Sequence, residues 1–367
     1  MNRFIISGGG TGGHIFPALA IANQLKKEIP DAVILFIGAT GKMEMTRVPE
    51  AGYDIVGLEV FGIRRDLSWG GIKNNLKLPF VLLKTMAKAK AIMQRFNPDV
   101  VIGVGGYASG PALRAAQALK IPTVIQEQNS YPGKTNKWLS KKVKKICVAY
   151  DGLERFFPKE KIVKTGNPVR AEIINFQPKL EEAYSFFNVD KNKKTVLIIG
   201  GSQGARTINQ AILAHIEDFK KLDCQLIWQT GELFHTANEA QLSVIKSQSI
   251  KILPFINRMD LAYSVADFIV SRAGALAIAE LTLVAVPTIL IPLPTAAEDH
   301  QTANAKQLSD AGAAVLLADK DAQEKLYETL ITLMNDAATS KEMSQKIKQF
   351  AQPDAIEKIV REICGER

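Results

Sequence analysis

The sequence predicts an α/β protein made of two Rossmann-like units, each built on a doubly wound parallel sheet. Short apolar segments recur along the 367 residues, each followed by a glycine-rich turn and then by apolar residues at helical spacing. This pattern restarts in the second half of the chain. The length also suits two or three domains of ordinary size.

The first domain is expected over residues 1–164. Its pattern opens with a strand at 4–7, a glycine-rich turn, and a helix at 17–27. Further strands are predicted at 32–37, 100–104, 123–126 and 145–148.

The second domain is expected over 165–345, because Thr165-Gly166-Asn167-Pro168 interrupts regular structure between the two halves. Its strands are predicted at 195–199, 225–229, 251–253, 268–270, 288–291 and 314–317. The remaining segment, 346–367, is expected to be helical and to return to the first domain.

The composition excludes several classes of protein. It is 47% hydrophobic and 23% charged, unlike disordered or collagenous chains. Three distant cysteines predict neither disulfides nor a cysteine metal site. The apolar stretch after Met1 is too short for a signal peptide, and the segment 281–293 is too short to span a membrane. We therefore expect a cytoplasmic protein, whose net charge of +9 favours an anionic partner.

A run of glycines from Gly8 to Gly13 stands between the first predicted strand and its helix. In that position glycines and a helix N-terminus form a cradle for an anion. A dinucleotide site is the alternative, but the strand at 32–37 is followed by Gly38-Ala39-Thr40 and not by the acidic residue that would hold a ribose. His14 ends the run and is a candidate general base, although a lone histidine is more often structural.

Two similar glycine turns follow predicted strands, at 103–111 and 200–206. Tight packing between strand and helix explains either turn alone. Three such turns, divided between two domains, instead predict a cleft in which the backbone of both walls contacts a polar ligand. Ser202 adds a hydroxyl donor, which indicates a diphosphate site.

Glu280 stands in an otherwise apolar helix that begins after Gly274. A carboxylate in such surroundings needs a partner. An ion pair is one interpretation; the preferred one is a pair of hydrogen bonds from the ribose hydroxyls of a nucleotide. The polar segments 126–129 and 294–304 follow other strands. A solvated loop and helix cap is one interpretation of 294–304; the other is that Gln301 and Asn304 bind sugar hydroxyls, as 126–129 would from the opposite wall. Asp319 and Asp321 have the spacing of a metal–diphosphate site, but loop and helix-cap roles fit their position better.

Residues 73–95 carry six basic side chains and no acidic ones, interleaved with leucine, valine and phenylalanine. A core helix with a solvated basic face is one interpretation, and a surface that docks on anionic lipid is the other. A second cluster, 134–145, contributes six lysines. Because aromatic residues that would stack on bases are sparse, we expect no nucleic-acid partner.

Taken together, these segments resemble the MurG family of bacterial glycosyltransferases, and the resemblance extends over nearly the whole chain. The motifs that carry it are GGGTGGH with FPALA (8–20), GVGGYASGP (103–111), QEQNSYPGKTNKWLS (126–140), GNPVR (166–170), GGSQGAR (200–206), SRAGALAIAEL (271–281) and HQTANA (300–305). The resemblance implies the GT-B arrangement, in which two Rossmann-like domains face each other across a cleft.

The resemblance also implies the roles of individual residues. In the first half, Thr11, Gly12 and Gly13 line the donor diphosphate or the acceptor, and Asn129 meets the donor sugar. Arg170 and Ser202 touch the diphosphate, and the backbone near Ile256 meets the uracil. The sugar, phosphate and ribose are met by Ala275, Leu276, Ala277, Ile278, Ala279 and Glu280. Gln301 binds sugar hydroxyls, although some relatives have two glutamines where this chain has His300-Gln301.

The implied reaction is an inverting transfer of N-acetylglucosamine from UDP-N-acetylglucosamine to the muramyl 4-hydroxyl of an undecaprenyl-linked muramyl-pentapeptide. This is a step of peptidoglycan synthesis, expected at the cytoplasmic face of the bacterial cell membrane. His14 is the expected base, with Glu127 in reserve, and no cofactor or obligatory metal is expected. The alternatives are a UDP-N-acetylglucosamine 2-epimerase, another lipid glycosyltransferase, and a non-catalytic nucleotide-binding module.

Overall fold

The computed structural model describes residues 1–60, 69–201, 204–296 and 299–365, with the backbone alone for 69–82. The chain forms two compact units, Met1–Arg170 with Asp354–Arg367, and Ala171–Pro353. Each contains an entirely parallel sheet with helices packed on it, which confirms the predicted fold class. The change between units falls after Arg170, six residues later than expected, and the chain rejoins the first unit at Asp354 and not at 346.

The sheet of the first unit has the strand order β3-β2-β1-β4-β5-β6-β7. The strands are β1 (Arg3–Ser7), β2 (Val33–Ala39), β3 (Asp54–Leu58), β4 (Val100–Gly103), β5 (Thr123–Glu127), β6 (Lys145–Val148) and β7 (Ile162–Lys164). The two edge strands, β3 and β7, were not predicted from the sequence. Because an edge strand is partly exposed, neither shows the continuous apolar run of a central parallel strand.

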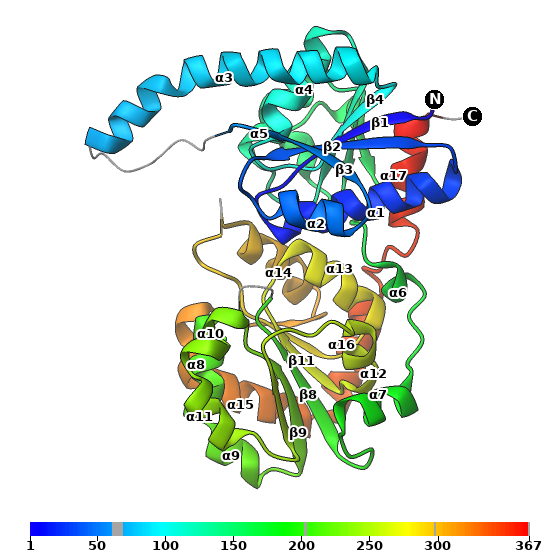
Figure 1. The fold of residues 1–367 in the computed structure, drawn as a ribbon. Coiled ribbons are helices and arrows are strands. Elements are labelled where there is room, and N and C mark those ends of the chain that lie inside the picture. The colour runs from blue at the N-terminus through cyan, green and yellow to red at the C-terminus, as the bar shows by residue number, and fades with distance from the viewer. Residues whose placement is uncertain (61–68, 202–203, 297–298, 366–367) are drawn as a thin grey trace. The chain divides into compact units, whose positions relative to one another are not determined.

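The helices of the first unit are α1 (Gly12–Glu28), α2 (Glu44–Glu50), α3 (Trp69–Phe96), α4 (Ser109–Ala118), α5 (Lys134–Leu139) and α17 (Ala355–Cys364). Helix α1 begins five residues before the predicted start at 17, so Gly12, Gly13 and His14 form its first turn. Helix α17 buries its apolar face, including Ile359 and Ile363, against this unit and contacts α1, β5 and β6 (Figure 1).

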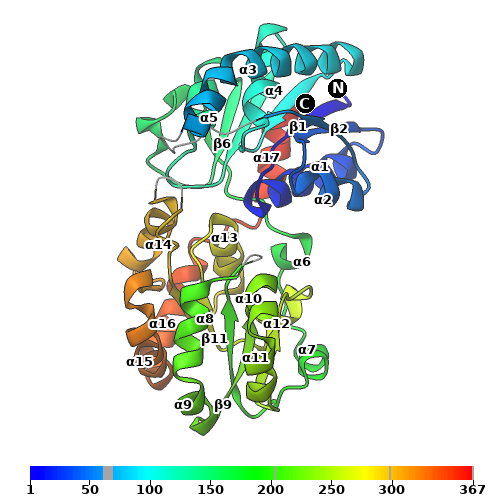
Figure 2. The same ribbon diagram turned by 60° about the vertical axis from the view of Figure 1, so that its left-hand side comes forward.

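Helix α3 contains the whole basic segment 73–95 and packs along α4 in both views (Figures 1 and 2). Over its described side chains, Thr85, Ala89 and Met93 are buried, whereas Leu83 and Lys84 are exposed. The carboxyl-terminal half of this helix is therefore amphipathic, with one face in the core and one basic face in solvent.

The sheet of the second unit has the order β10-β9-β8-β11-β12-β13. Its strands are β8 (Lys194–Ile199), β9 (Cys224–Gln229), β10 (Ile250–Leu253), β11 (Phe268–Ser271), β12 (Thr288–Leu290) and β13 (Val315–Leu316). Its helices are α6 (Ala171–Ile174), α7 (Leu180–Phe187), α8 (Arg206–Ala214), α9 (Ile216–Lys221), α10 (Glu232–Ala237), α11 (Glu239–Ile245), α12 (Met259–Val265), α13 (Ala275–Val284), α14 (His300–Asp310), α15 (Ala322–Asn335) and α16 (Ala337–Lys348).

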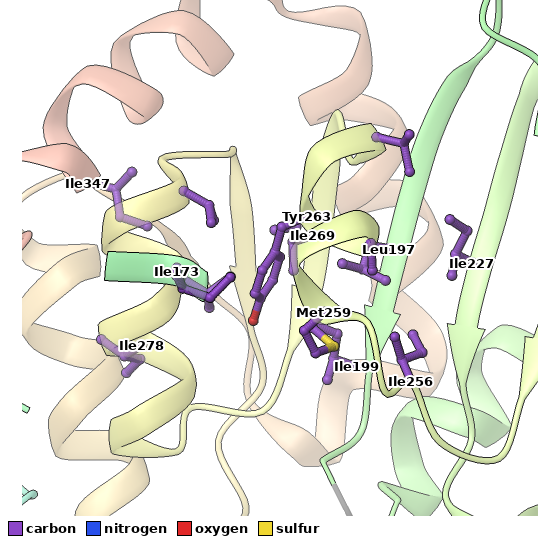
Figure 3. Packing of buried hydrophobic residues seen from close by; sticks show 14 of the residues in the cluster. Ile173, Leu197, Ile199, Ile227, Ile256, Met259, Tyr263, Ile269, Ile278 and Ile347 are labelled. Atoms are coloured by element: carbon purple, nitrogen blue, oxygen red, sulfur yellow. The ribbon is translucent and has the colours of Figure 1, made fainter. Parts of the chain in front are cut away.

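Two apolar clusters cover the two faces of this second sheet, because successive side chains of a strand point to opposite faces. Leu197 and Ile199 of β8 pack with helices α7, α12 and α13. The alternate residues Val196 and Ile198 pack with α8, α11 and α15. Figure 3 shows part of the first cluster, with Tyr263 lying among its aliphatic side chains. The α12–α13 layer is therefore held firmly on the sheet that carries the second set of candidate site residues.

Candidate active site

In the first unit, three neighbouring strands end where the sequence motifs begin. β1, β4 and β5 are adjacent and parallel, and they end at Ser7, Gly103 and Glu127. Carboxyl ends of parallel strands share one edge of the sheet, which is where doubly wound folds bind ligands. The motifs at 8–14, 103–111 and 126–140 therefore meet at one edge, as a single site requires.

The first two glycine loops are packed directly against each other. Gly105 and Gly106 both have positive φ angles, of 95° and 84°. A Cβ atom added to Gly106 would lie 2.3 Å from the Gly9 carbonyl oxygen, and one added to Gly105 would lie 2.5 Å from Cδ2 of His14. Any larger residue would push the loops apart. The glycines thus allow the His14 ring to lie against the backbone of the neighbouring loop.

His14 is the third residue of α1, after the N-cap residue Thr11. Its backbone N–H donates to the Thr11 carbonyl (3.1 Å), and its Nδ1 lies 3.4 Å from the Thr11 hydroxyl oxygen. The ring is partly exposed. The structure therefore gathers Thr11, Gly12, Gly13 and His14 into one helical turn at the carboxyl end of β1, with the imidazole accessible to a reactant.

Glu127 is enclosed, with 2% of its surface exposed. Its carboxylate accepts hydrogen bonds from the side chain of Asn136 (2.8 Å), from both nitrogens of Asn129 (3.1 and 3.3 Å) and from the Gly133 N–H (3.2 Å). Burial is the main influence on its pKa, which lies above the usual glutamate range. This geometry favours a role in shaping the loop that carries Asn129 over the role of reserve base.

Two neighbouring glutamines, which we expected to read sugar hydroxyls, are buried structural groups instead. Gln126 donates to Oδ1 of Asn167 (3.0 Å), Asn167 donates to the Gln128 carbonyl (2.9 Å), and Gln128 donates to the Val104 carbonyl (2.9 Å). Gln126 and Gln128 are at most 2% exposed. This amide network joins three motifs of the first unit, and Arg170, which is exposed, follows its last member by three residues.

In the second unit, a buried glutamine joins two loops at the carboxyl edge of the sheet. Gln229 ends β9, donates to the Gly201 carbonyl (2.9 Å) and accepts from the Ile256 N–H (3.1 Å). It thereby fixes the turn after β8 to the segment expected to meet uracil. Sequence reasoning missed Gln229, although a polar residue that closes an apolar strand is a usable signal. Ser202, the expected diphosphate donor, lies outside the described residues.

Helix α13 divides the predicted contact segment into buried and accessible side chains. Ala275 and Ile278 are buried, and Figure 3 shows Ile278 within the apolar cluster. Leu276, Ala277 and Ala279 are partly exposed. The side chain of Ile278 is therefore part of the core and not a ligand contact, which leaves only its backbone for a ligand.

Glu280 is buried to 6% exposure and accepts a hydrogen bond from the Tyr263 hydroxyl (2.9 Å). Tyr263 lies on α12, within the apolar cluster. The sequence predicted that this carboxylate needs a partner, and the tyrosine is one. Because the hydroxyl binds Oε2, it fixes the direction in which the carboxylate points.

Gln301 lies in the first turn of α14, and its side-chain oxygen accepts from the Leu293 N–H (2.9 Å). This bond connects the helix to the segment that follows β12. The position agrees with the expected edge of the sheet, while its contact with sugar hydroxyls stays a prediction.

The DxD-spaced aspartates have structural partners. Asp319 forms an ion pair with Arg272 and accepts from the Thr207 hydroxyl (3.0 Å), and Asp321 pairs with Lys325 (3.6 Å). Arg272 also donates to two backbone carbonyls after β12. These contacts favour the loop and helix-cap interpretation. Within the described ranges, no group of three histidine, cysteine, aspartate or glutamate side chains is arranged to hold a metal ion.

Units that each carry glycine loops at the carboxyl edge of a parallel sheet are typical of enzymes that bind nucleotides, and comparison with known proteins gives the family. Residues 4–148 match the glycosyltransferase family 28 N-terminal domain, and residues 195–359 match its C-terminal domain. The chain therefore belongs to glycosyltransferase family 28 and, within it, to the MurG family.

Relatives and solved structures agree with this membership. The chain is 50% identical to proteins of Flavobacterium psychrophilum and Cytophaga hutchinsonii, over 98% of this chain and 96% of each relative. Both are named UDP-N-acetylglucosamine--N-acetylmuramyl-(pentapeptide) pyrophosphoryl-undecaprenol N-acetylglucosamine transferase. The crystal structure of Acinetobacter baumannii MurG is 31% identical and superposes with a TM-score of 0.78, covering 99% of both chains.

A more distant structure shows how far the fold extends. The UDP-GlcNAc 2-epimerase of Neisseria meningitidis, solved with UDP-GlcNAc, superposes with a TM-score of 0.66 at 16% identity, covering 99% of this chain and all of the other. At this identity the likeness is one of fold alone.

Proposed function

We propose that the protein transfers N-acetylglucosamine from UDP-N-acetylglucosamine to the 4-hydroxyl of the muramyl sugar of undecaprenyl-pyrophosphoryl-N-acetylmuramyl-pentapeptide. The observation that carries this proposal is the 50% identity over almost the full length to relatives named for this transfer. The first-unit loops support it because they present an accessible imidazole at a ligand-binding edge.

The two units have different tasks in this proposal. In the first unit His14 accepts the proton of the attacking hydroxyl, a contribution typically worth ~10² to 10⁴ in rate. In the second unit Glu280 accepts hydrogen bonds from the ribose, and backbone N–H groups at the start of α13 stabilise charge that develops on the leaving diphosphate. The reaction needs no cofactor and no obligatory metal in this scheme.

Product analysis with purified protein tests the proposal. UDP-N-acetylglucosamine labelled in the sugar is supplied with the lipid-linked muramyl acceptor, and labelled lipid product is expected only when both substrates are present. An epimerase would instead convert the labelled nucleotide sugar without the acceptor. Formation of an epimer with no lipid product would overturn the proposed transfer and favour that second candidate.

The acceptor's isoprenoid tail stays in a bilayer, so the proposal includes peripheral docking on anionic lipid at the cytoplasmic face. Over the described residues, no helix combines the length and apolar character needed to cross a membrane. The first unit offers two basic surfaces. One is the exposed face of α3 near Leu83 and Lys84. The other is a groove whose lining includes five lysines, at 120, 141, 142, 144 and 161.

A further inference from the structure

A buried glutamate outside the predicted site binds the backbone of the first glycine loop. Glu44 is the first residue of α2 and is completely buried. Its Oε2 accepts a hydrogen bond from the Gly10 N–H (2.8 Å), and its Oε1 accepts from the Ala39 N–H (2.9 Å). The carboxylate therefore joins the turn after β1 to the end of β2 through both of its oxygens.

The glycines around this carboxylate leave room for it. A Cβ atom on Gly9 would lie 2.1 Å from Oε1 of Glu44, and one on Gly38 would lie 2.5 Å from its Cγ. Glycine at both positions is thus explained by the glutamate, which fills the space that side chains would take. Because the carboxylate holds the Gly10 N–H, we expect a change in the carboxylate to move the Gly9–Gly10 backbone.

That backbone leads directly to the candidate base. The Gly9 carbonyl lies against Gly106, whose neighbour Gly105 lies against the His14 ring. Gly10 is also followed by Thr11, whose carbonyl accepts from the His14 N–H. Two routes of close contact therefore run from the glutamate to the imidazole, one through the second glycine loop and one through the N-cap.

We propose that Glu44 is a positioning residue for the transfer reaction. Its carboxylate holds the Gly9–Gly10 turn in the position that keeps the His14 ring against Gly105 of the neighbouring loop. The proposal rests on the proposed function. It also revises the anion cradle predicted from the sequence, because the Gly10 N–H is occupied by a carboxylate. The Gly10 N–H is therefore not available to an anionic ligand.

The test is Glu44→Gln, which keeps the volume but replaces one acceptor oxygen with an NH₂ group. That group would face a backbone N–H, so one of the two bonds is lost and the turn shifts. We expect kcat to fall about 10- to 100-fold, the cost of misplacing a base by a fraction of an ångström to an ångström. The KM for UDP-N-acetylglucosamine should change far less than kcat, because most of the proposed donor contacts, including those of α13, lie in the other unit.

Asp99→Asn is the matched control. Asp99 accepts hydrogen bonds from the backbone N–H groups of Asn2 (2.8 Å) and Arg3 (3.0 Å), both at Oδ2, so its carboxylate supports the opposite end of the same strand. We expect this variant to lose stability and to keep the wild-type kcat. A purely structural role for Glu44 would make the two variants behave alike.

A second readout does not depend on activity. The chain has four histidines, so the imidazole resonances can be assigned by NMR with one His→Ala variant for each. Glu44→Gln should shift the His14 resonances, and Asp99→Asn should leave them in place. Should Glu44→Gln fail to fold, Glu44→Asp, which keeps the charge but is one methylene shorter, takes its place in both measurements.

The outcomes separate this proposal from the function on which it rests. Wild-type protein without transferase activity would overturn the proposed function, while the His14 resonances would still report on the Glu44 geometry. An active wild type in which Glu44→Gln matches Asp99→Asn in kcat and in the His14 resonances would overturn the positioning role.

Discussion

The two units carry their candidate site residues in opposite ways. In the first unit, a partly exposed His14 lies against tightly packed glycine loops. Buried carboxylate and amide side chains hold these loops through hydrogen bonds. In the second, the key side chain is itself buried: Glu280 lies in the α12–α13 layer and a tyrosine hydroxyl orients it. The first arrangement suits a group that must move a proton, and the second suits a group that must recognise a fixed ligand.

The largest expected effect comes from removing the exposed group of the first unit. His14→Ala should lower turnover at saturating donor by about 10²- to 10⁴-fold, while donor affinity stays near normal, because a base acts mainly in the transition state. Steady-state kinetics measure both. His215→Ala, at a histidine paired with Asp218 in the other unit, is the control and should keep its turnover. A His14 variant that retains most of its turnover would contradict the assignment.

The next effect concerns the buried group of the second unit. Glu280→Ala should weaken UDP binding by roughly 3–5 kcal/mol, because two charge-assisted hydrogen bonds are lost. Tyr263→Phe removes only the hydroxyl that orients the carboxylate and should cost about 1 kcal/mol of binding free energy. Calorimetric titration with UDP measures both changes.

Nucleotide analogues test the same assignment without mutation. If Glu280 binds both ribose hydroxyls, the unmodified protein must discriminate against 2′-deoxy-UDP. Equal affinity for UDP and the deoxy analogue would contradict the assignment of Glu280 as the residue that binds the ribose hydroxyls. The Tyr263–Glu280 hydrogen bond would then be a purely structural contact.

The proposed membrane docking assigns a basic surface to the first unit alone. Replacing Lys73, Lys77 and Lys84 with glutamate should weaken binding to anionic vesicles by at least ~3 kcal/mol, at ~1 kcal/mol per basic residue near the surface. Activity on the full-length lipid acceptor should fall, whereas activity on a short-chain soluble acceptor should not. Vesicle binding by the unmodified protein should also weaken as salt rises, because salt screens the attraction.

Two further triple variants locate the docking surface. Charge reversal at exposed lysines of the second unit, at 320, 325 and 341, should leave vesicle binding unchanged if only the first unit docks. Reversal at 120, 142 and 144 tests the lysine-lined groove. If the groove variant lost vesicle binding and the α3 variant bound normally, the docking surface would be the groove and not α3.

The sequence predicted the central strands of both sheets and most of the site edge, because buried parallel strands and glycine turns leave local patterns. It did not predict the edge strands β3 and β7, whose partial exposure removes the apolar run. Nor did it find the supporting roles of Glu44 and Gln229. Most of their partners are backbone groups of loops that only the sheet order brings near, so spacing along the chain does not reveal these contacts.

The smallest expected effect is a pH dependence of stability that arises from Glu127, a buried carboxylate behind the first-unit loops. Burial holds the pKa of Glu127 above its ordinary value despite the hydrogen bonds that the carboxylate accepts. A raised pKa in the folded state means that the folded protein binds the proton more tightly than the unfolded chain does. The stability that this proton supplies is complete below the ordinary glutamate range and is lost as pH rises through the folded pKa.

Glu127→Gln removes this titration. The variant should therefore show a flatter dependence of unfolding free energy on pH, above the ordinary glutamate range, than the unmodified protein. The expected difference is about 1.4 kcal/mol for each unit by which the pKa is raised. Urea unfolding at a series of pH values from 4 to 7 measures it for both proteins. Parallel profiles would show that folding does not raise the pKa of Glu127, and that the four hydrogen bonds to its carboxylate offset its burial.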